Sequence, residues 1–203
     1  MLINWNSREL HLKIVYCGPA LSGKTTNLEF IHGNTASQKK SELISLKTQG
    51  DRTLFFDFMQ MELEKISGLT PKIHLYTVPG QPFYETTRKL VLRGADGVVF
   101  VADSSRLSLG ANIEAWNDMF EHLSSLELLC PQFPVVVQFN KQDLTTKLPS
   151  KILSRQMSLN GYPTTKAVAL QGQGVFDTLK VVLNGVLQNI QKELVSPVPT
   201  TRE

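Results

Sequence analysis

The sequence predicts an α/β fold: a mixed, mainly parallel six-stranded sheet with helices on both faces and an extra strand at the N-terminus. Apolar, β-branched runs alternate with longer stretches of helical periodicity, which is typical of a doubly wound sheet. A glycine-rich loop joins the first such run to a helix. The 203 residues suffice for one domain with a buried core.

The first half of the chain contains three expected strands of the sheet core. Residues 10–18, "LHLKIVYCG", predict a strand that leads into the glycine-rich loop, and "LINWN" before it supplies the extra strand. A helix is expected over 23–33. Strands follow at 53–59 and 71–78. Their short connection predicts an antiparallel pair, because parallel strands need a longer crossover.

The second half supplies the remaining strands and two long helices. Residues 96–103, "DGVVFVAD", are almost continuously apolar, as expected of a buried parallel strand. Apolar residues at three- and four-residue spacing predict helices over 110–129 and 175–195. A further buried strand, "FPVVVQFNKQD", begins at residue 133, and the sixth strand is expected over 165–170.

The composition indicates a soluble domain that does not bind nucleic acid. Hydrophobic residues make up 41% and charged residues 19%, and a formal charge of +3 is too mild for a nucleic-acid-binding surface. Two cysteines without CxxC spacing indicate a reducing compartment. No signal peptide, membrane-spanning stretch or lipidation motif is recognisable, so we expect a cytoplasmic protein without a direct membrane anchor, and a monomer. Residues 1–195 are expected to form one domain and residues 196–203 a short disordered tail.

The stretch "GPALSGKT" matches the phosphate-loop pattern G-x-x-x-x-G-K-[ST] between the first strand and its helix. Its glycines allow backbone amides to turn toward phosphate oxygens, and the helix adds the positive end of its dipole. Lys24 should reach the β- and γ-phosphates, and the Thr25 hydroxyl should bind Mg²⁺. The expected phosphate-binding residues are Gly18, Pro19, Ala20, Leu21, Ser22, Gly23, Lys24, Thr25 and Thr26.

A second motif, "NKQD" at residues 140–143, predicts that the base is guanine. Asp143 can accept hydrogen bonds from N1 and N2 of guanine, a donor pair that adenine lacks. Asn140 can tie this loop to the phosphate loop, and the stem of Lys141 can lie on the purine face. The amide of the middle residue in the loop after the sixth strand should contact guanine O6; that loop consists of Val168, Ala169 and Leu170. The sequence therefore predicts GTP and GDP as ligands, with Mg²⁺ as cofactor.

Beyond these motifs, nearly the whole chain resembles the Ras-like small GTPases, and most closely the bacterial MglA type that governs cell polarity and motility. The resemblance rests on "KIVYCGPALSGKTTNL", "DRTLFFDF", "HLYTVPGQPFY", "RKLVLRGADGVVFVADS" and "NKQDL". It implies a Ras-like P-loop GTPase fold. It also implies that Thr77, where Ras-like proteins carry a magnesium-site Asp, is a family trait. Thr77 would hold Mg²⁺ through a bound water, with weaker dependence on the metal.

The resemblance further implies catalytic and switching roles. Gly80 and Gln81 match the positions that sense the γ-phosphate and orient the attacking water, and Thr53 matches the switch threonine that closes on Mg²⁺. Arg52 corresponds to an arginine finger supplied in cis. Gln81, Arg52 and Lys24 are thus the expected catalytic residues. The strand that begins at Thr53 is expected to slide when GTP replaces GDP.

Two kinds of partner are implied by the same resemblance. One is an activating Roadblock-fold dimer of the MglB type, and the other is a set of polarity or motility effectors that bind the GTP form, which would concentrate the protein at a cell pole. The runs "LFFDFMQM" and "PFY" are apolar enough for a partner surface. Alternatively Phe55, Phe56 and Phe58 pack in the core, because strand residues alternate between faces.

Ala20 departs from the family pattern, since related phosphate loops usually have glycine there. Its methyl group can displace Gln81, and a displacement of about 1 Å can cost on the order of 100-fold in rate. We therefore expect tight GTP binding with slow hydrolysis. The alternative is that small shifts of the loop accommodate the methyl group.

Two other functions are alternatives to a GTPase switch. A GTP-sensing module with negligible turnover would signal by occupancy and partner recruitment; Ala20 and Thr77 favour it, whereas Gln81 and Arg52 argue against it. A small P-loop kinase would need a lid with several arginines. Only Arg155 occurs between the prolines at 131 and 163, and "NKQD" would have no role there.

Overall fold

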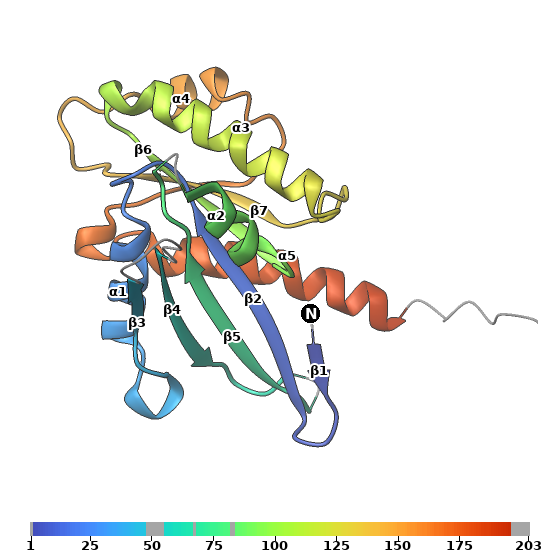
Figure 1. Cartoon of the computed structure of the whole chain (residues 1–203). Helices are drawn as coiled ribbons and strands as arrows, with labels where there is room; N and C mark the ends of the chain where they lie inside the picture. Colours follow the sequence, from blue (N-terminus) through green and yellow to red (C-terminus); the bar gives the residue numbers. More distant parts are fainter. Residues whose placement is uncertain (1, 48–54, 67, 82–83, 196–203) are drawn as a thin grey trace, which may run out of the picture.

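The computed structural model of the chain describes residues 2–47, 55–66, 68–81 and 84–195 (Figure 1). The strands are β1 (Leu2–Asn4), β2 (Glu9–Cys17), β3 (Ile44–Lys47), β4 (Phe55–Glu62), β5 (Thr70–Thr77), β6 (Gly97–Asp103), β7 (Val135–Asn140) and β8 (Thr164–Lys166). The α-helices are α1 (Lys24–Asn34), α2 (Glu85–Leu92), α3 (Leu109–Ser125), α4 (Ser150–Gln156) and α5 (Val175–Val195). Short 3₁₀ helices are η1 (Ser37–Lys39), η3 (Arg106–Ser108) and η4 (Ala169–Gln171).

The strands form one mixed sheet in the order β3-β4-β5-β2-β6-β7-β8, and β1 pairs with β2. Strands β5, β2, β6, β7 and β8 are parallel, whereas β4 pairs antiparallel with both β3 and β5. The expected antiparallel pair is confirmed by the register that places Phe58 opposite Tyr76. The extra N-terminal strand is also present, as β1.

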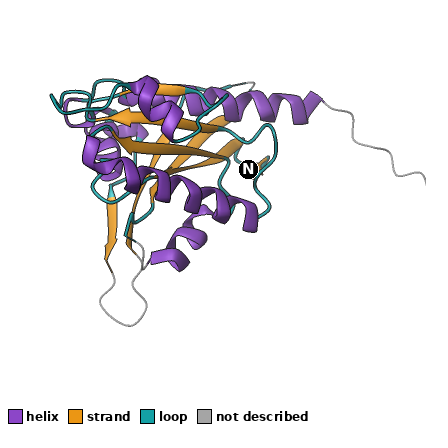
Figure 2. Ribbon diagram, turned by 90° about the horizontal axis from the view of Figure 1, so that it is seen from above, coloured by secondary structure: helices purple, strands orange, loops and turns teal. Residues whose placement is uncertain are grey.

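Helices cover both faces of the sheet, so that two separate cores form (Figure 2). Helices α1 and α5 pack on one face. The buried residues of this core include Leu28 and Ile31 of α1 and Val182 of α5, which pack with alternate residues of β2, β5 and β4. Helices α2, α3 and α4 pack on the other face, over β6 and β7. Every residue of β6 and β7 is buried, because both faces of these central strands are covered.

Among the strands and α-helices of the described residues, three were not predicted: β3, α2 and α4. Strand β3 lies at the edge of the sheet and has only 4 residues, and although its sequence Ile-Ser-Leu-Lys alternates, it is too short to stand out as a strand. Helices α2 and α4 have only 8 and 7 residues, too few for a clear helical period.

Two predicted elements end earlier than expected. The sixth strand, predicted over 165–170, is β8 and ends at Lys166. The amide of Val168 donates to the Gln173 carbonyl at 3.0 Å, which turns the chain away from the sheet. The helix predicted over 110–129 is α3 and ends at Ser125, because Glu127 adopts a left-handed conformation with φ of 57°.

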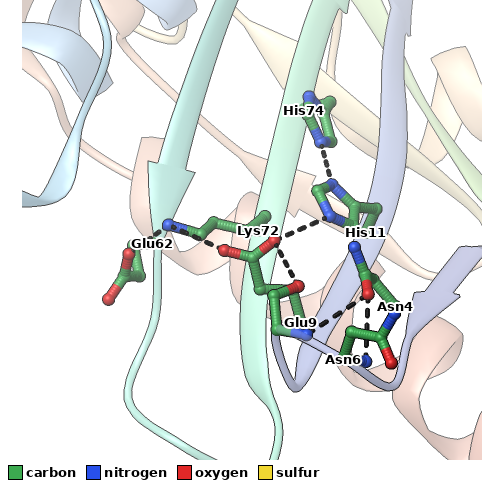
Figure 3. A network of polar contacts seen from close by, with 8 residues as sticks. Asn4, Asn6, Glu9, His11, Glu62, Lys72 and His74 are labelled. Atoms are coloured by element: carbon green, nitrogen blue, oxygen red, sulfur yellow. Dashed lines mark hydrogen bonds and ion pairs between the residues drawn. The ribbon is translucent and has the colours of Figure 1, made fainter.

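A network of polar side chains joins β2, β5 and β4 at the end of β2 remote from the glycine-rich loop (Figure 3). His11 Nδ1 lies 3.0 Å from His74 Nε2, and His11 Nε2 lies 3.3 Å from the Glu9 carboxylate. Lys72 pairs with Glu9 and Glu62. Within the described ranges, no group of three or more His, Cys, Asp or Glu side chains is placed to hold a metal ion, and no helix is long and apolar enough to cross a membrane.

The parallel strands place the phosphate loop and the "NKQD" loop together at the carboxyl end of the sheet. Strands β2, β6, β7 and β8 end at Cys17, Asp103, Asn140 and Lys166, and their carboxyl ends face the same way. In open α/β sheets, ligands bind at the carboxyl ends of the strands.

Candidate nucleotide site

The phosphate loop has a backbone that only glycine tolerates at two points. Gly18 and Gly23 have φ of 133° and 101°, in the left-handed region. A Cβ atom at Gly18 would lie 2.3 Å from the Val101 carbonyl oxygen, and one at Gly23 would lie 2.2 Å from Asn140 Nδ2. The glycine spacing of the motif therefore reflects close packing of the loop against β6 and β7.

Two buried polar side chains lie within this loop. Lys24 Nζ donates to the carbonyls of Gly18 at 3.0 Å and Pro19 at 2.7 Å. Burial lowers the pKa of Lys24 to about 8, although the nearby Cys17 and Asp57 oppose this shift. Ser22 Oγ is fully buried and has no hydrogen-bond partner among the described residues. A buried hydroxyl without a partner costs free energy, and a phosphate oxygen in the loop would satisfy it.

Two cavities lie on either side of the phosphate loop, and Leu21 lines both. The first, of about 320 Å³, is lined by Lys24, Thr25, Asp57, Thr77 and Gly80 among others. The second, of about 250 Å³, is lined by Thr26, Asn140, Lys141, Asp143, Val168, Ala169 and Leu170 among others. The residues predicted for phosphate and for base thus gather in two adjacent spaces.

The base loop is tied to the phosphate loop as predicted. Asn140 Nδ2 donates to the Ser22 carbonyl at 2.8 Å. Lys141 Nζ forms an ion pair of 2.7 Å with Asp103, which fixes the lysine stem at the mouth of the base cavity. Asp143 is exposed, so its carboxylate is open to a ligand.

The Ala169 amide is placed differently from the expectation. It donates to Asn140 Oδ1 at 2.9 Å, a bond that closes the base loop onto η4. Contact between this amide and guanine O6 would have to share or replace that bond. Leu170, on the same short helix, is 82% exposed at the rim of the cavity.

A carboxylate missed by the sequence analysis lies beside the predicted metal residues. Asp57 on β4 accepts a 2.6 Å hydrogen bond from the Thr25 hydroxyl and a 2.8 Å bond from the Thr77 hydroxyl. The Asp57 amide donates to the same Thr77 oxygen at 2.9 Å, and Ser45 Oγ of β3 donates to the other carboxylate oxygen at 2.7 Å. A carboxylate of the neighbouring antiparallel strand thus lies in direct contact with Thr77.

The loop after β5 passes very close to the phosphate loop. A Cβ atom at Gly80 would lie 2.2 Å from the Ala20 amide nitrogen and 2.4 Å from the Pro19 carbonyl carbon. Gln81 follows, is exposed, and lines the first of the two cavities together with Ala20. The predicted catalytic residue Arg52 and the predicted switch threonine Thr53 lie outside the described residues.

The face of β4 on which Phe56 and Phe58 lie is half-buried and aromatic. The ring of Phe58 packs on Tyr76 with centroids 4.8 Å apart, and Phe56 approaches Tyr76 at 6.0 Å. The fully buried core residues of β4 are instead Met59 and Met61 on the opposite face. The side chain of Phe55 is not among those described.

Because Asn140 joins the base loop to the phosphate loop, one purine nucleotide can span both cavities, with Asp143 at its base and Lys24 at its phosphates. On a mixed sheet with this strand order, that arrangement defines a GTPase of the Ras-like class.

Comparison with known proteins gives the family. No protein-family model matches the chain. The mutual gliding-motility protein MglA of Myxococcus xanthus (strain DK1622) is 47% identical over 190 residues, which cover 94% of this chain and 97% of the relative. Two Ras-related proteins are 24% identical: Rab-5B of Plasmodium falciparum (isolate 3D7), over 74% of this chain and 65% of its own length, and Rab7 of Drosophila melanogaster, over 93% and 86%. The chain belongs to the MglA family of Ras-like small GTPases.

Proposed function

We propose that this GTPase is a switch for cell polarity and gliding motility, in which hydrolysis of GTP to GDP and phosphate ends the active state. The observation that carries the nucleotide part is the tie from Asn140 to Ser22, which aligns the guanine-selective loop with the phosphate loop. The 47% identity to a gliding-motility protein over almost the whole chain supports the biological role.

In this proposal Lys24 and the loop amides hold the phosphates, and Asp143 selects guanine. Thr25 and Asp57 would hold Mg²⁺, with Thr77 acting through a bound water; hydroxyl and carboxylate oxygens are the ligands that this ion prefers. The ion would neutralise charge on the β- and γ-phosphate oxygens. The fit rests on the convergence of the Thr25 and Thr77 hydroxyls on one Asp57 oxygen.

The hydrolytic step requires that a water molecule attack the γ-phosphate in line with the leaving oxygen. Gln81 would orient this water, and Gly80 would sense the γ-phosphate with its amide. Arg52 would stabilise charge on the transferred phosphoryl group, and Thr53 would close on the metal. The close approach of Gly80 to Ala20 supports a contact between this loop and the phosphates.

The partners follow from the family. We propose a Roadblock-fold dimer of the MglB type as the activating protein, and motility effectors that bind the GTP form. The protein would act in the cytoplasm and gather at a cell pole through such partners. The half-exposed aromatic residues Phe56, Phe58 and Tyr76 support a partner surface on β4 and β5.

The methyl group of Ala20 makes intrinsic hydrolysis slow in this proposal. Ala20 lies on the loop against which Gly80 packs, and Gly80 comes directly before Gln81 in the sequence. The test is single-turnover hydrolysis of GTP by the wild type and by Ala20→Gly, each with and without an MglB-type dimer. We expect Ala20→Gly to hydrolyse GTP about 10- to 100-fold faster than the wild type.

Each outcome of this experiment has a clear meaning. If the wild type already turns over rapidly with the dimer and Ala20→Gly adds nothing, the methyl group is accommodated. If neither protein releases phosphate under any condition, the chain is a GTP-sensing module that signals by occupancy. A failure to prefer GTP over ATP in a competition assay would overturn the switch itself.

A further inference from the structure

Arg88 on α2 binds the backbone of Gln81. Its Nη1 donates to the Gln81 carbonyl oxygen at 2.6 Å, across seven residues of chain. The same carbonyl accepts a longer bond of 3.4 Å from the Tyr84 amide, just before α2 begins. The backbone of Gln81 is therefore attached to the helix that follows it.

The guanidinium group is itself held by the neighbouring helix. Arg88 Nη2 lies 3.7 Å from the Asp118 carboxylate, and Arg88 Nε lies 3.5 Å from His122 Nε2, both on α3. The Arg88 side chain is only 12% exposed, so water competes little for these contacts. Because a guanidinium group is planar and has five donors, it can contact three partners in fixed directions.

We propose that Arg88 is a positioning residue for hydrolysis, which fixes Gln81 by joining its backbone to α3. The inference rests on the proposed function, in which Gln81 orients the attacking water. In this role Arg88 acts through the Gln81 backbone. The carbonyl–guanidinium bond sets where the Gln81 Cα lies, and the side chain then pivots from that point.

The cavity beside Gln81 makes the hydrogen bond from Arg88 to the Gln81 carbonyl important. A cavity of about 290 Å³ lies between the phosphate loop, α2 and α3, and its lining includes Ala20, Gln81, Arg88, Asp118 and His122. Gln81 thus has open space on one side rather than packed side chains. Without Arg88, little on this side would keep the Gln81 backbone from shifting, and a shift of about 1 Å can cost on the order of 100-fold in rate.

The test measures single-turnover GTP hydrolysis by the full chain, with radiolabelled phosphate followed over hours so that slow rates are measured. Arg88→Ala should slow hydrolysis about tenfold or more, with GTP and GDP affinities unchanged. Added guanidinium ion at millimolar concentration should restore part of that rate. Lys89→Met, next in sequence and paired only on the surface with Glu85, is the matched control and should keep the wild-type rate.

A double mutant separates positioning from a general structural effect. If Arg88 acts through Gln81, Arg88→Ala should slow Gln81→Ala no further, because the two changes remove one interaction. Asp118→Asn, which keeps Arg88 but weakens its anchor, should slow hydrolysis about threefold and provides the test if Arg88→Ala does not fold. Melting temperatures show whether each variant is folded.

The outcomes distinguish this inference from the proposed function. If Gln81→Ala slows hydrolysis but both Arg88→Ala and Asp118→Asn keep the wild-type rate, the positioning role is wrong and the switch stands. Additive losses in the double mutant, or no response to guanidinium ion, would also overturn it. If Gln81→Ala itself has no effect, the role of Gln81 in the proposed function fails first.

Discussion

Thr25, the predicted magnesium ligand at the start of α1, donates a 2.6 Å hydrogen bond to Asp57 on β4. This bond joins the phosphate loop to the strand that precedes β5 and its Thr77. It places a carboxylate where the sequence has only a threonine, and the carboxylate comes from the antiparallel neighbour of β5. The polar groups around Thr25 therefore come from two neighbouring strands, β4 and β5.

We predict that Asp57→Asn weakens Mg²⁺ binding to the nucleotide complex about 10- to 100-fold, because hydrogen bonds to a charged group contribute about 1.5–3 kcal/mol. The measurement is the rate of release of a fluorescent GDP analogue over a series of free Mg²⁺ concentrations. Asp177→Asn, an exposed change in the first turn of α5, is the control. If the Mg²⁺ concentration at which the release rate changes half-way is the same in Asp57→Asn and the wild type, Asp57 is excluded from the metal site.

Thr77→Asp should behave differently alone and in combination. Alone it places a second carboxylate within hydrogen-bonding distance of Asp57, and two such charges repel each other. We expect lower stability without Mg²⁺ and a steeper stabilisation by the metal than in the wild type. The double change Thr77→Asp with Asp57→Asn moves the single acid to β5 and should recover most of the affinity lost in Asp57→Asn. Thermal melts with and without Mg²⁺ test both statements.

The parts of the site that sequence analysis found are those in which neighbours in the chain are neighbours in space. The phosphate loop from Gly18 to Thr25 and the "NKQD" loop each form one turn at the end of one strand, so spacing alone reveals them. Asp57 was missed because its role depends on the register between β4 and β5. The only signal in the sequence was an acid within the apolar run "LFFDFM".

Contacts between residues that are distant in the sequence also explain why the pairing of Asp103 and some of the elements were not predicted. Asp103 ends a buried strand and pairs with Lys141, 38 residues away, a contact that no local pattern encodes. Strand β3 has only 4 residues and is recognisable as a strand through its antiparallel pairing with β4, a contact between segments that are separated in the sequence. The fold class could be predicted because buried strands and a long amphipathic helix such as α5 are written into the sequence as periodicity.

A buried network joins the phosphate loop to β7 and α5. Asn27 of α1 and Gln138 of β7 exchange two hydrogen bonds of 2.9 Å, and Gln138 also donates to Thr178 of α5 at 2.9 Å. All three side chains are fully buried. Asn27 in addition donates to the Gly23 carbonyl of the phosphate loop at 2.8 Å.

We predict that Gln138→Leu destabilises the protein, because it leaves the buried Asn27 Oδ1 without its donor, whereas Asn27 Nδ2 keeps its bond to Gly23 and Thr178 Oγ1 keeps its bond to Gly174. A buried acceptor without a partner costs about 1–3 kcal/mol. Urea unfolding measures the loss, and Gln191→Leu on the exposed side of α5 should stay within about 0.5 kcal/mol of the wild type. A Gln138→Leu variant as stable as the wild type would show that the network contributes no net stability.

The last prediction concerns His122, which is buried on α3 beside Arg88. Burial lowers the pKa of His122, and the positive charges of Arg88 and Lys89 lower it further, while Glu85 and Asp118 act in the opposite direction. The unfolded chain has the ordinary histidine pKa of about 6.5. Between the lowered native value and that unfolded value, the unfolded state binds a proton that the native state does not.

Stability must therefore rise with pH through this window and level off above the unfolded pKa. His74, whose pKa is also lowered by burial, contributes in the same direction, so the wild type alone does not isolate His122. We expect the free energy of unfolding to fall less on acidification from pH 7.5 to 5.5 in His122→Asn than in the wild type, measured by urea unfolding at intermediate steps. Parallel curves for the two proteins would mean that His122 takes up its proton equally well in both states. A protonated His122 also cannot accept the Arg88 hydrogen bond and repels the guanidinium group, so hydrolysis should decline only at the acidic end of this window and below it, where the native state takes up the proton.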